Sequence, residues 1–138
     1  MKKSSLFKFI DLPKHFDQRG SLIALESNKE IPFDIERVYY IFDNKSDVPR
    51  GFHAHKHLKQ VAICLHGSCK FTLDDGLSRE EYIIKNNHQG ILIEEMIWRE
   101  MSDFEDGTIV LVLASEAYSE KDYIRDYDEF LTLTSSYD

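Results

Sequence analysis

The sequence predicts an all-β fold, either a small barrel or a double-sheet jelly roll, with one short helix near the C-terminus. Many short segments rich in β-branched and aromatic residues follow one another at regular spacing. Turn sequences rich in glycine, aspartate and asparagine separate them, such as Asp74-Asp75-Gly76 and Asn86 to Gly90. A closed barrel leaves no open sheet edge and provides a mouth for a ligand.

The strands are predicted from alternation and from strand-forming residues. In chain order they cover residues 5–12, 21–26, 37–42, 49–56, 61–65, 69–73, 80–85, 91–93, 96–101 and 108–114. A turn at Asp17 to Ser21 separates the first two, and the loop from Asn28 to Phe33 contains Pro32 as a breaker. Residues 109–114 are nearly all apolar, which predicts a central strand.

The predicted helix covers Asp122 to Leu131. Tyr123, Tyr127 and Phe130 recur at helical spacing, so they would share one face of that helix. The polar tail after Leu131 is expected to fray.

Composition narrows the class of protein. A chain of 138 residues fits a single domain over residues 1–138, and a net charge of −8 argues against binding to nucleic acid or to anionic membranes. The apolar runs have the length of strands, so no membrane span is predicted. Without an apolar stretch after Met1, a cytoplasmic location is expected, with Cys64 and Cys69 as reduced packing residues.

Two histidines two residues apart, His53 and His55, lie in the segment 49–56. Side chains of a strand alternate between its faces, so both histidines should lie on one face. Burying two such polar groups is costly, which favours a functional site over a core role. The pattern resembles the first cupin motif, His-x-His followed by Glu and Gly, with Gln60 in place of the Glu and Gly67 as the Gly.

The same region argues against a metal. Many cupins bind a metal through both histidines, the glutamate and a further histidine in a second motif. Here Gln60 replaces the carboxylate, and Arg99 stands near the position of the last ligand. A guanidinium cannot ligate and repels a cation. His57 adds a histidine but no carboxylate, so neither a metal nor another cofactor is predicted.

Without a metal, the histidines are candidates for acid–base chemistry, because imidazole exchanges protons near neutral pH. Tyr39 lies in the predicted strand 37–42, where it could serve as a proton donor or equally as a core aromatic. Arg37, Arg50 and Arg99 could provide positive charge around an anionic substrate.

At this point the chain resembles a known group, the TDP-4-keto-6-deoxyglucose 3,4-ketoisomerases, which are small cupin-fold enzymes of deoxyaminosugar synthesis. The matching blocks span residues 17 to about 130, in order. They are Asp17–Leu22, Arg37–Phe42, Arg50–Lys56, Trp98–Met101, Val112–Ser115 and Asp122–Tyr127, with Gln60 and Gly67 between them. His-x-His alone would be a weak signal, whereas the ordered blocks are specific.

The resemblance implies a homodimeric, metal-free cupin that binds a dTDP-linked 4-keto-6-deoxy sugar and moves its ketone from C4 to C3. By position, the implied catalytic residues are Tyr39, His53 and His55, with His53 as the principal base. The implied substrate-binding residues are Arg19, Arg37, Arg50, Gln60, Trp98 and Arg99. The implied setting is the synthesis of dideoxyaminosugars of the Qui3NAc or Fuc3NAc type, as in lipopolysaccharide O-antigens.

Two positions disagree about the product. Some fucose-type members have a histidine where this chain has Arg99, which favours the gluco product, whereas Arg19 resembles the fucose type. Two alternatives to the isomerase stay open. One is a nucleotide-sugar epimerase on the same fold, such as a 3,5-epimerase. The other is a non-catalytic cupin that binds sugar nucleotides.

Overall fold

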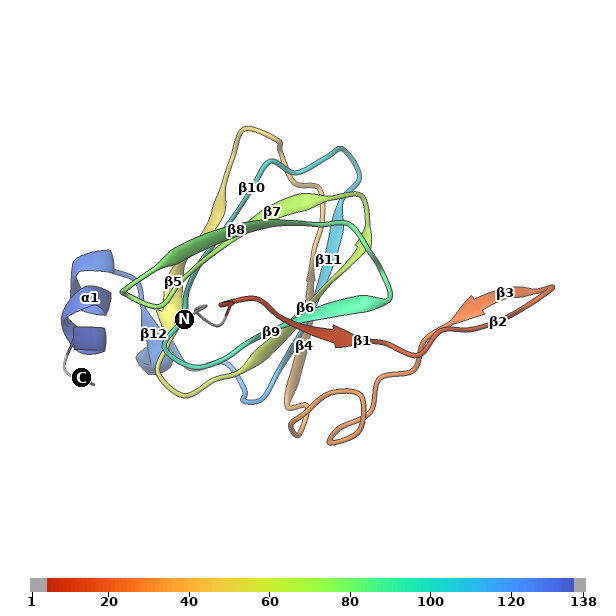
Figure 1. The fold of residues 1–138 in the computed structure, drawn as a ribbon, viewed down its shortest axis with the longest axis horizontal. Helices are drawn as coiled ribbons and strands as arrows, with labels where there is room; N and C mark the ends of the chain where they lie inside the picture. Colours follow the sequence, from red (N-terminus) through yellow and green to blue (C-terminus); the bar gives the residue numbers. More distant parts are fainter. Residues whose placement is uncertain (1–4, 136–138) are drawn as a thin grey trace.

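Two five-stranded antiparallel sheets face each other and form a jelly-roll barrel, in agreement with the predicted all-β cupin fold (Figure 1). The computed structural model describes residues 5–135. One sheet has the strand order β1-β9-β6-β11-β4 and the other β12-β5-β10-β7-β8. No helix within the described residues is long and apolar enough to cross a membrane.

The first sheet contains strands from both halves of the chain. They are β1 (Lys8–Asp11), β9 (Gln89–Ile93), β6 (Gln60–His66), β11 (Ile109–Ala114) and β4 (Arg37–Ile41). The apolar strand β11 lies between β6 and β4, which confirms its predicted central position.

The second sheet contains β12 (Tyr123–Ile124), β5 (Arg50–His55), β10 (Trp98–Ser102), β7 (Cys69–Asp74) and β8 (Arg79–Ile84). The turn at Asp74-Asp75-Gly76 joins β7 to β8, as its sequence predicts. Side chains from both sheets meet in a core that includes Phe71, Leu73 and Val110. The buried polar residues His55, Gln60 and Arg99 lie outside this apolar cluster.

Strand β5, which carries both histidines, is bent by a bulge. Gly51 has φ +95° and Phe52 has φ +61°, and the register with β10 shifts between Arg99 and Glu100. A Cβ on residue 51 would lie 2.9 Å from the carbonyl oxygen of Arg99, so only glycine fits there without a shift of the backbone. The bulge thus sets how the histidines enter the barrel.

The C-terminal segment corrects one prediction. The helix α1 covers Tyr127–Ser135, and the residues before it form a 3₁₀ turn, η1 (Glu120–Asp122), and the strand β12. Tyr123 pairs with His55 in the sheet, and this pairing outweighs the helical spacing of the aromatic residues. Of the tail expected to fray, Thr132 to Ser135 belong to the helix, and residues 136–138 lie outside the described residues.

A second correction concerns the N-terminal region. The predicted strand 21–26 is confirmed only at Ser21 and Leu22, which belong to β3 (Gly20–Leu22), and the chain then leaves the strand conformation. β3 pairs with β2 (His15–Asp17) in a hairpin whose turn lies in the segment where a turn is predicted. The hairpin forms a sheet of its own and projects away from the barrel, on the side opposite to β5 and β12 (Figure 1).

Candidate active site

His53 and His55 lie together on the interior wall formed by β5 and β10. Their ring centroids are 5.0 Å apart in an edge-to-face arrangement, as the period-two pattern predicts for one strand face. The ring of Tyr123, from β12, contacts both imidazoles at centroid distances of 4.9 and 4.4 Å. The three rings therefore fix one another in position.

The surroundings keep both imidazoles neutral. Burial and, to a smaller extent, the nearby Arg99 guanidinium lower the pKa of His53 from 6.5 to about 4, while a backbone contact with Gly51 opposes the change. Burial, Arg99 and His53 also lower the pKa of His55 well below its usual range, against the opposing effect of Asp122. At neutral pH both groups can accept a proton.

The opposite wall provides Tyr39 from β4 and Gln60 from β6. The amide Nε2 of Gln60 donates a hydrogen bond of 3.0 Å to the hydroxyl oxygen of Tyr39. The Oε1 of Gln60 accepts from Nη1 of Arg99. Arginine can only donate, so its position fixes the amide orientation and makes Gln60 the donor toward Tyr39. Burial raises the pKa of the Tyr39 hydroxyl, which stays protonated at neutral pH.

Arg99 joins the two walls. It is only 2% exposed, and its Nη2 donates to the carbonyl of Ile97 at 2.9 Å. Burial lowers its pKa to about 10, so it remains positively charged at neutral pH. Both of its hydrogen-bond acceptors are neutral, and a positive charge is thus held beside the two histidines without a hydrogen-bonded carboxylate.

Further arginines lie next to this site. The guanidinium of Arg37 lies 4.7 Å from the ring centroid of Tyr39 and 5.2 Å from that of Tyr118, and its buried Nη1 has no hydrogen-bond partner among residues 5–135. Arg125 lies 4.2 Å from the ring centroid of Tyr123 and forms an ion pair of 2.6 Å with Glu120. Of the two, Arg37 has unused capacity to bind an anion.

Three of the proposed substrate-binding residues lie apart from the histidines. Arg19, in the turn of the projecting hairpin, has a 90% exposed side chain that pairs with Asp17 at 2.6 Å. Arg50 is exposed at the start of β5. Trp98 is buried against Phe130 of α1, and its Nε1 donates to Glu100 at 2.9 Å. Within one chain, the structure therefore does not bring these three to the site.

Two site residues were missed because their segment was predicted to be helical. Tyr123 packs on both imidazoles, and Asp122 Oδ2 lies 3.1 Å from Nδ1 of His55. The only sequence signal for them was the Asp122–Tyr127 block, which the resemblance singled out without giving it a role. Within the described residues, no three histidine, cysteine, aspartate or glutamate side chains are grouped so that they could hold a metal ion.

Comparison with known proteins gives consistent matches over nearly the whole chain. Residues 5–135 match the family model described as FdtA: WxcM-like, C-terminal. The chain is 52% identical over 123 residues, 89% of this chain and 88% of the relative, to a TDP-4-oxo-6-deoxy-α-D-glucose-3,4-oxoisomerase from Aneurinibacillus thermoaerophilus.

Solved structures agree with this match. A mutant of the 3,4-ketoisomerase QdtA from Thermoanaerobacterium thermosaccharolyticum, in complex with TDP-4-keto-6-deoxyglucose, superposes with a TM-score of 0.93 at 40% identity, covering 97% of each chain. The TDP-quinovose 3,4-ketoisomerase WlaRB from Campylobacter jejuni gives a TM-score of 0.88 at 51% identity, covering 91% of this chain and 97% of that one. The chain belongs to the FdtA/WxcM-like family of cupin-fold sugar 3,4-ketoisomerases, and it is an isomerase.

Proposed function

We propose that this isomerase converts dTDP-4-keto-6-deoxyglucose into dTDP-3-keto-6-deoxyglucose by metal-free acid–base catalysis through an enediol. One observation carries the proposal: His53 and His55 pack ring to ring on one wall, and the buried Arg99, which lies near both, is linked through Gln60 to Tyr39 on the other wall. A ketone shift needs several proton carriers around one sugar ring and a charge that stabilises the enediolate.

The proton steps can be assigned so that they balance. His53 takes the C3 proton, and the electron pair of that bond forms the C3–C4 double bond while the C4 carbonyl becomes an enediolate. His55 accepts the proton of the C3 hydroxyl and returns it to the C4 oxygen. C4 then takes up a proton as the C3 carbonyl forms. The catalyst recovers its starting state by proton exchange with solvent.

Stereochemistry connects the product with the two walls. For the gluco product, the hydrogen removed from C3 of the substrate and the hydrogen added at C4 lie on opposite faces of the ring, so the proton on C4 must come from a carrier other than His53. Tyr39 projects from the sheet opposite to that of β5, and we assign the delivery to it. In the galacto product the two hydrogens share a face, and His53 alone could serve both carbons.

Three observations bear on the choice of product. Arg99 occupies the position where fucose-type members have histidine, and a guanidinium stays protonated, so it cannot replace a histidine as a proton donor. The 51% identity to a TDP-quinovose 3,4-ketoisomerase also favours the gluco product. Arg19 favours the fucose type, and we give it less weight because it lies in the turn of the hairpin β2–β3, which projects away from β5, the strand of the histidines.

The metal-free part of the proposal is supported by charge. A cation between the histidines would lie close to the Arg99 guanidinium, whose positive charge lowers the pKa of both imidazoles. Gln60, in the place of the cupin glutamate, already uses both ends of its amide on Tyr39 and Arg99. We expect full activity after treatment with a chelator. A stoichiometric metal ion in protein purified without a histidine tag would contradict this.

An NMR time course of dTDP-4-keto-6-deoxyglucose with the protein in D₂O tests the reaction. We expect the ketone to move from C4 to C3 and deuterium to appear at C4, with turnover by the His53→Asn variant lowered by about 10²–10⁴-fold. Inversion at C5 without a ketone shift would establish an epimerase. A bound but unchanged sugar would establish a binding protein.

A labelled substrate tests the stereochemistry. With deuterium at C3 in ordinary water, transfer by two carriers should lose the label, whereas a single carrier on one face should retain part of it at C4. The coupling constants of the reduced product give its C4 configuration independently. The proposed place of the reaction is before amination at C3, in the synthesis of a dideoxyaminosugar.

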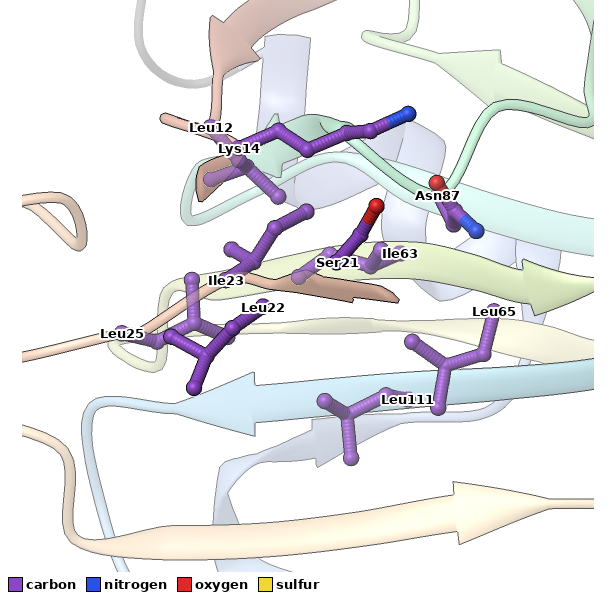
Figure 2. Close-up of a pocket in the computed structure, with 10 residues that line it drawn as sticks. All are labelled: Leu12, Lys14, Ser21, Leu22, Ile23, Leu25, Ile63, Leu65, Asn87 and Leu111. Atoms are coloured by element: carbon purple, nitrogen blue, oxygen red, sulfur yellow. The ribbon is translucent and has the colours of Figure 1, made fainter. Parts of the chain in front are cut away.

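We also propose a homodimer, because the outer face of the first sheet is apolar and open. Tyr40, Phe42 and Leu65 are 62%, 53% and 41% exposed. A groove of about 360 Å³ lies next to them, and in Figure 2 side chains of the segment 21–25 line it together with Leu65 and Leu111. The hairpin β2–β3 forms a separate two-stranded sheet, which is marginally stable by itself. A second copy of the chain would cover both features.

A dimer would also explain Arg19. If this residue binds substrate, it reaches a site only in the partner subunit, because its own hairpin points away from β5. Mixing an Arg19→Ala chain with a His53→Asn chain tests this. Mixed dimers would contain one intact site, and we expect about one quarter of wild-type activity at equal amounts. No recovery in verified mixed dimers would place Arg19 in its own chain's site or outside catalysis.

A further inference from the structure

Asp122 reaches the histidine pair from a distant part of the sequence. It is the last residue of η1 and lies 67 positions after His55. Its side chain is only 7% exposed. Asp122 Oδ1 accepts the backbone N–H of His57 at 2.8 Å, and Oδ2 accepts that of Leu58 at 3.3 Å. These bonds hold the carboxylate at the end of β5, where the chain turns.

The remaining contact of this carboxylate determines the state of His55. Oδ2 lies 3.1 Å from Nδ1 of His55, and a carboxylate can only accept, so Nδ1 must carry the hydrogen. A neutral imidazole has one N–H, which leaves Nε2 with a free lone pair. Nε2 of His55 is buried and has no hydrogen-bond partner among residues 5–135. The Tyr123 ring, 4.4 Å away, restricts rotation of the imidazole.

We propose that Asp122 is a positioning residue that locks His55 in the Nδ1–H tautomer and so reserves Nε2 for the substrate's hydroxyl proton. This inference rests on the proposed function and deepens it, because it assigns different work to the two histidines. When Nε2 accepts the proton of the C3 hydroxyl, the resulting imidazolium is paired with Asp122 and can release the same proton to the C4 oxygen. Among residues 5–135, Nδ1 of His53 is buried without a hydrogen-bond partner, and the nearby Glu120 is bound to Arg125.

The Asp122→Asn variant provides the direct test. The asparagine can keep its oxygen on the N–H of His57, and its NH₂ then faces Nδ1 of His55. A donor at that place favours the Nε2–H tautomer, which removes the free lone pair. We expect kcat to fall about 10²-fold or more, with KM changed by less than about threefold. Long-range ¹⁵N–¹H spectra should show His55 changing from the Nδ1–H to the Nε2–H form.

The matched control is Asp74→Asn, which alters another buried carboxylate. Asp74 is 3% exposed and accepts the N–H of Gly76 at 2.7 Å, Nε of Arg79 at 3.0 Å and the hydroxyl of Tyr127 at 2.6 Å, but it contacts no histidine. It should leave the His55 tautomer unchanged and kcat within about twofold of wild type. If Asp74→Asn lowered kcat as much as Asp122→Asn does, the loss of kcat would be a general result of removing a buried carboxylate. That outcome would overturn the proposal.

The tautomer of the unmodified protein decides the question even if Asp122→Asn does not fold. A wild-type His55 in the Nε2–H form would overturn the inference whether or not the protein isomerises the sugar. A wild-type His55 in the Nδ1–H form, in a protein that binds the sugar without moving its ketone, would support the lock while refuting the proposed function. The two failures are therefore distinguishable.

Discussion

The two walls of the candidate site, one on each sheet of the barrel, hold their reactive groups in opposite ways. On the wall of β5, the neighbour of His55 is an acceptor, the carboxylate of Asp122. On the facing wall, the neighbour of Tyr39 is a donor, the amide of Gln60. An acceptor beside an imidazole leaves its other nitrogen free to accept, whereas a donor beside a phenol oxygen leaves the phenol hydrogen free to be donated.

In our proposal, the hydrogen-bond partner of each reactive group determines which proton transfer it can perform. The histidine wall removes the C3 proton and carries a proton between the two oxygens, and the tyrosine wall supplies the C4 proton. The two walls also differ in backbone geometry, because β5 contains the bulge at Gly51 and Phe52 whereas β4 has no residue with positive φ. Five predictions test how far this division holds.

The largest effect is expected from removing one reactive group from each wall. His53→Asn should lower kcat by about 10²–10⁴-fold and stop the exchange of the C3 proton with solvent. Tyr39→Phe should lower kcat by about 10²-fold while C3 exchange continues, because deprotonation takes place on the other wall. NMR in D₂O measures both rates. Loss of C3 exchange in Tyr39→Phe would contradict the division of roles.

A smaller loss is expected from Gln60→Glu, which replaces the donor beside Tyr39 with an acceptor. The Tyr39 hydroxyl should then donate to the new carboxylate, and its hydrogen would no longer be available to substrate. We expect kcat to fall about 10-fold, with folding preserved because the two side chains have nearly the same shape. Steady-state kinetics and thermal melting measure these quantities. Unchanged kcat would show that the Gln60 amide does not orient Tyr39.

The pH profile should reveal the neutral state of the histidine wall. Because the pKa of His53 is lowered to about 4, the base is neutral above that pH, and kcat/KM should decrease only as the pH falls toward 4, rather than near 6.5. Between these two values the unfolded chain binds a proton that the folded chain does not. The free energy of unfolding should therefore decrease as the pH falls through this window.

Replacing the buried charge provides the matched comparison for the pH profile. In Arg99→Met the pKa of His53 should rise, because the positive charge that helps to lower it is removed. The acid side of the residual activity profile should then move to higher pH. Circular dichroism at each pH separates protonation of the site from acid unfolding, and an unchanged profile would show that burial alone determines this pKa.

The smallest effect on turnover is expected from Gly51→Ala, which tests the bulge on the histidine wall through the stability of the fold. The added Cβ would meet the Arg99 carbonyl at 2.9 Å in a residue with φ +95°. We expect a loss of about 1–3 kcal/mol in the free energy of unfolding. Gly107→Ala is the control, because φ there is +81° but the nearest atom lies 3.7 Å away. Equal losses in chemical denaturation would show that φ, rather than contact with Arg99, requires the glycine.

Most of the barrel could be predicted from the sequence because alternation and turn residues are local signals. The segment 37–42 became β4 and the segment 69–73 became β7, each within one residue. The segment after Asp122 could not be predicted in this way. Tyr123, Tyr127 and Phe130 fit a helix by spacing, but Tyr123 gains a strand partner in His55, which is distant in sequence. Only α1 keeps the helical conformation.

The site divides along the same line. His53 and His55 could be placed on one face because side chains in a strand alternate between faces every two residues. Arg99 was recognised because it stands near the position where metal-binding cupins have their last metal ligand. The partnership of Asp122 with His55 depends on how η1 packs against the end of β5, which no local pattern encodes. The hairpin β2–β3 was missed for a different reason. Its strands are three residues long and every residue in them is exposed, so no alternation of buried and exposed side chains identifies them as strands.

The isolated charge of Arg99 has a consequence for the history of this chain. A buried guanidinium with only neutral hydrogen-bond acceptors makes the resting fold less stable than an apolar side chain of similar volume would. In our proposal this charge is retained because turnover requires it. A copy of this barrel that had lost the reaction would be free to replace Arg99 by an apolar residue, and that replacement should make the barrel harder to unfold.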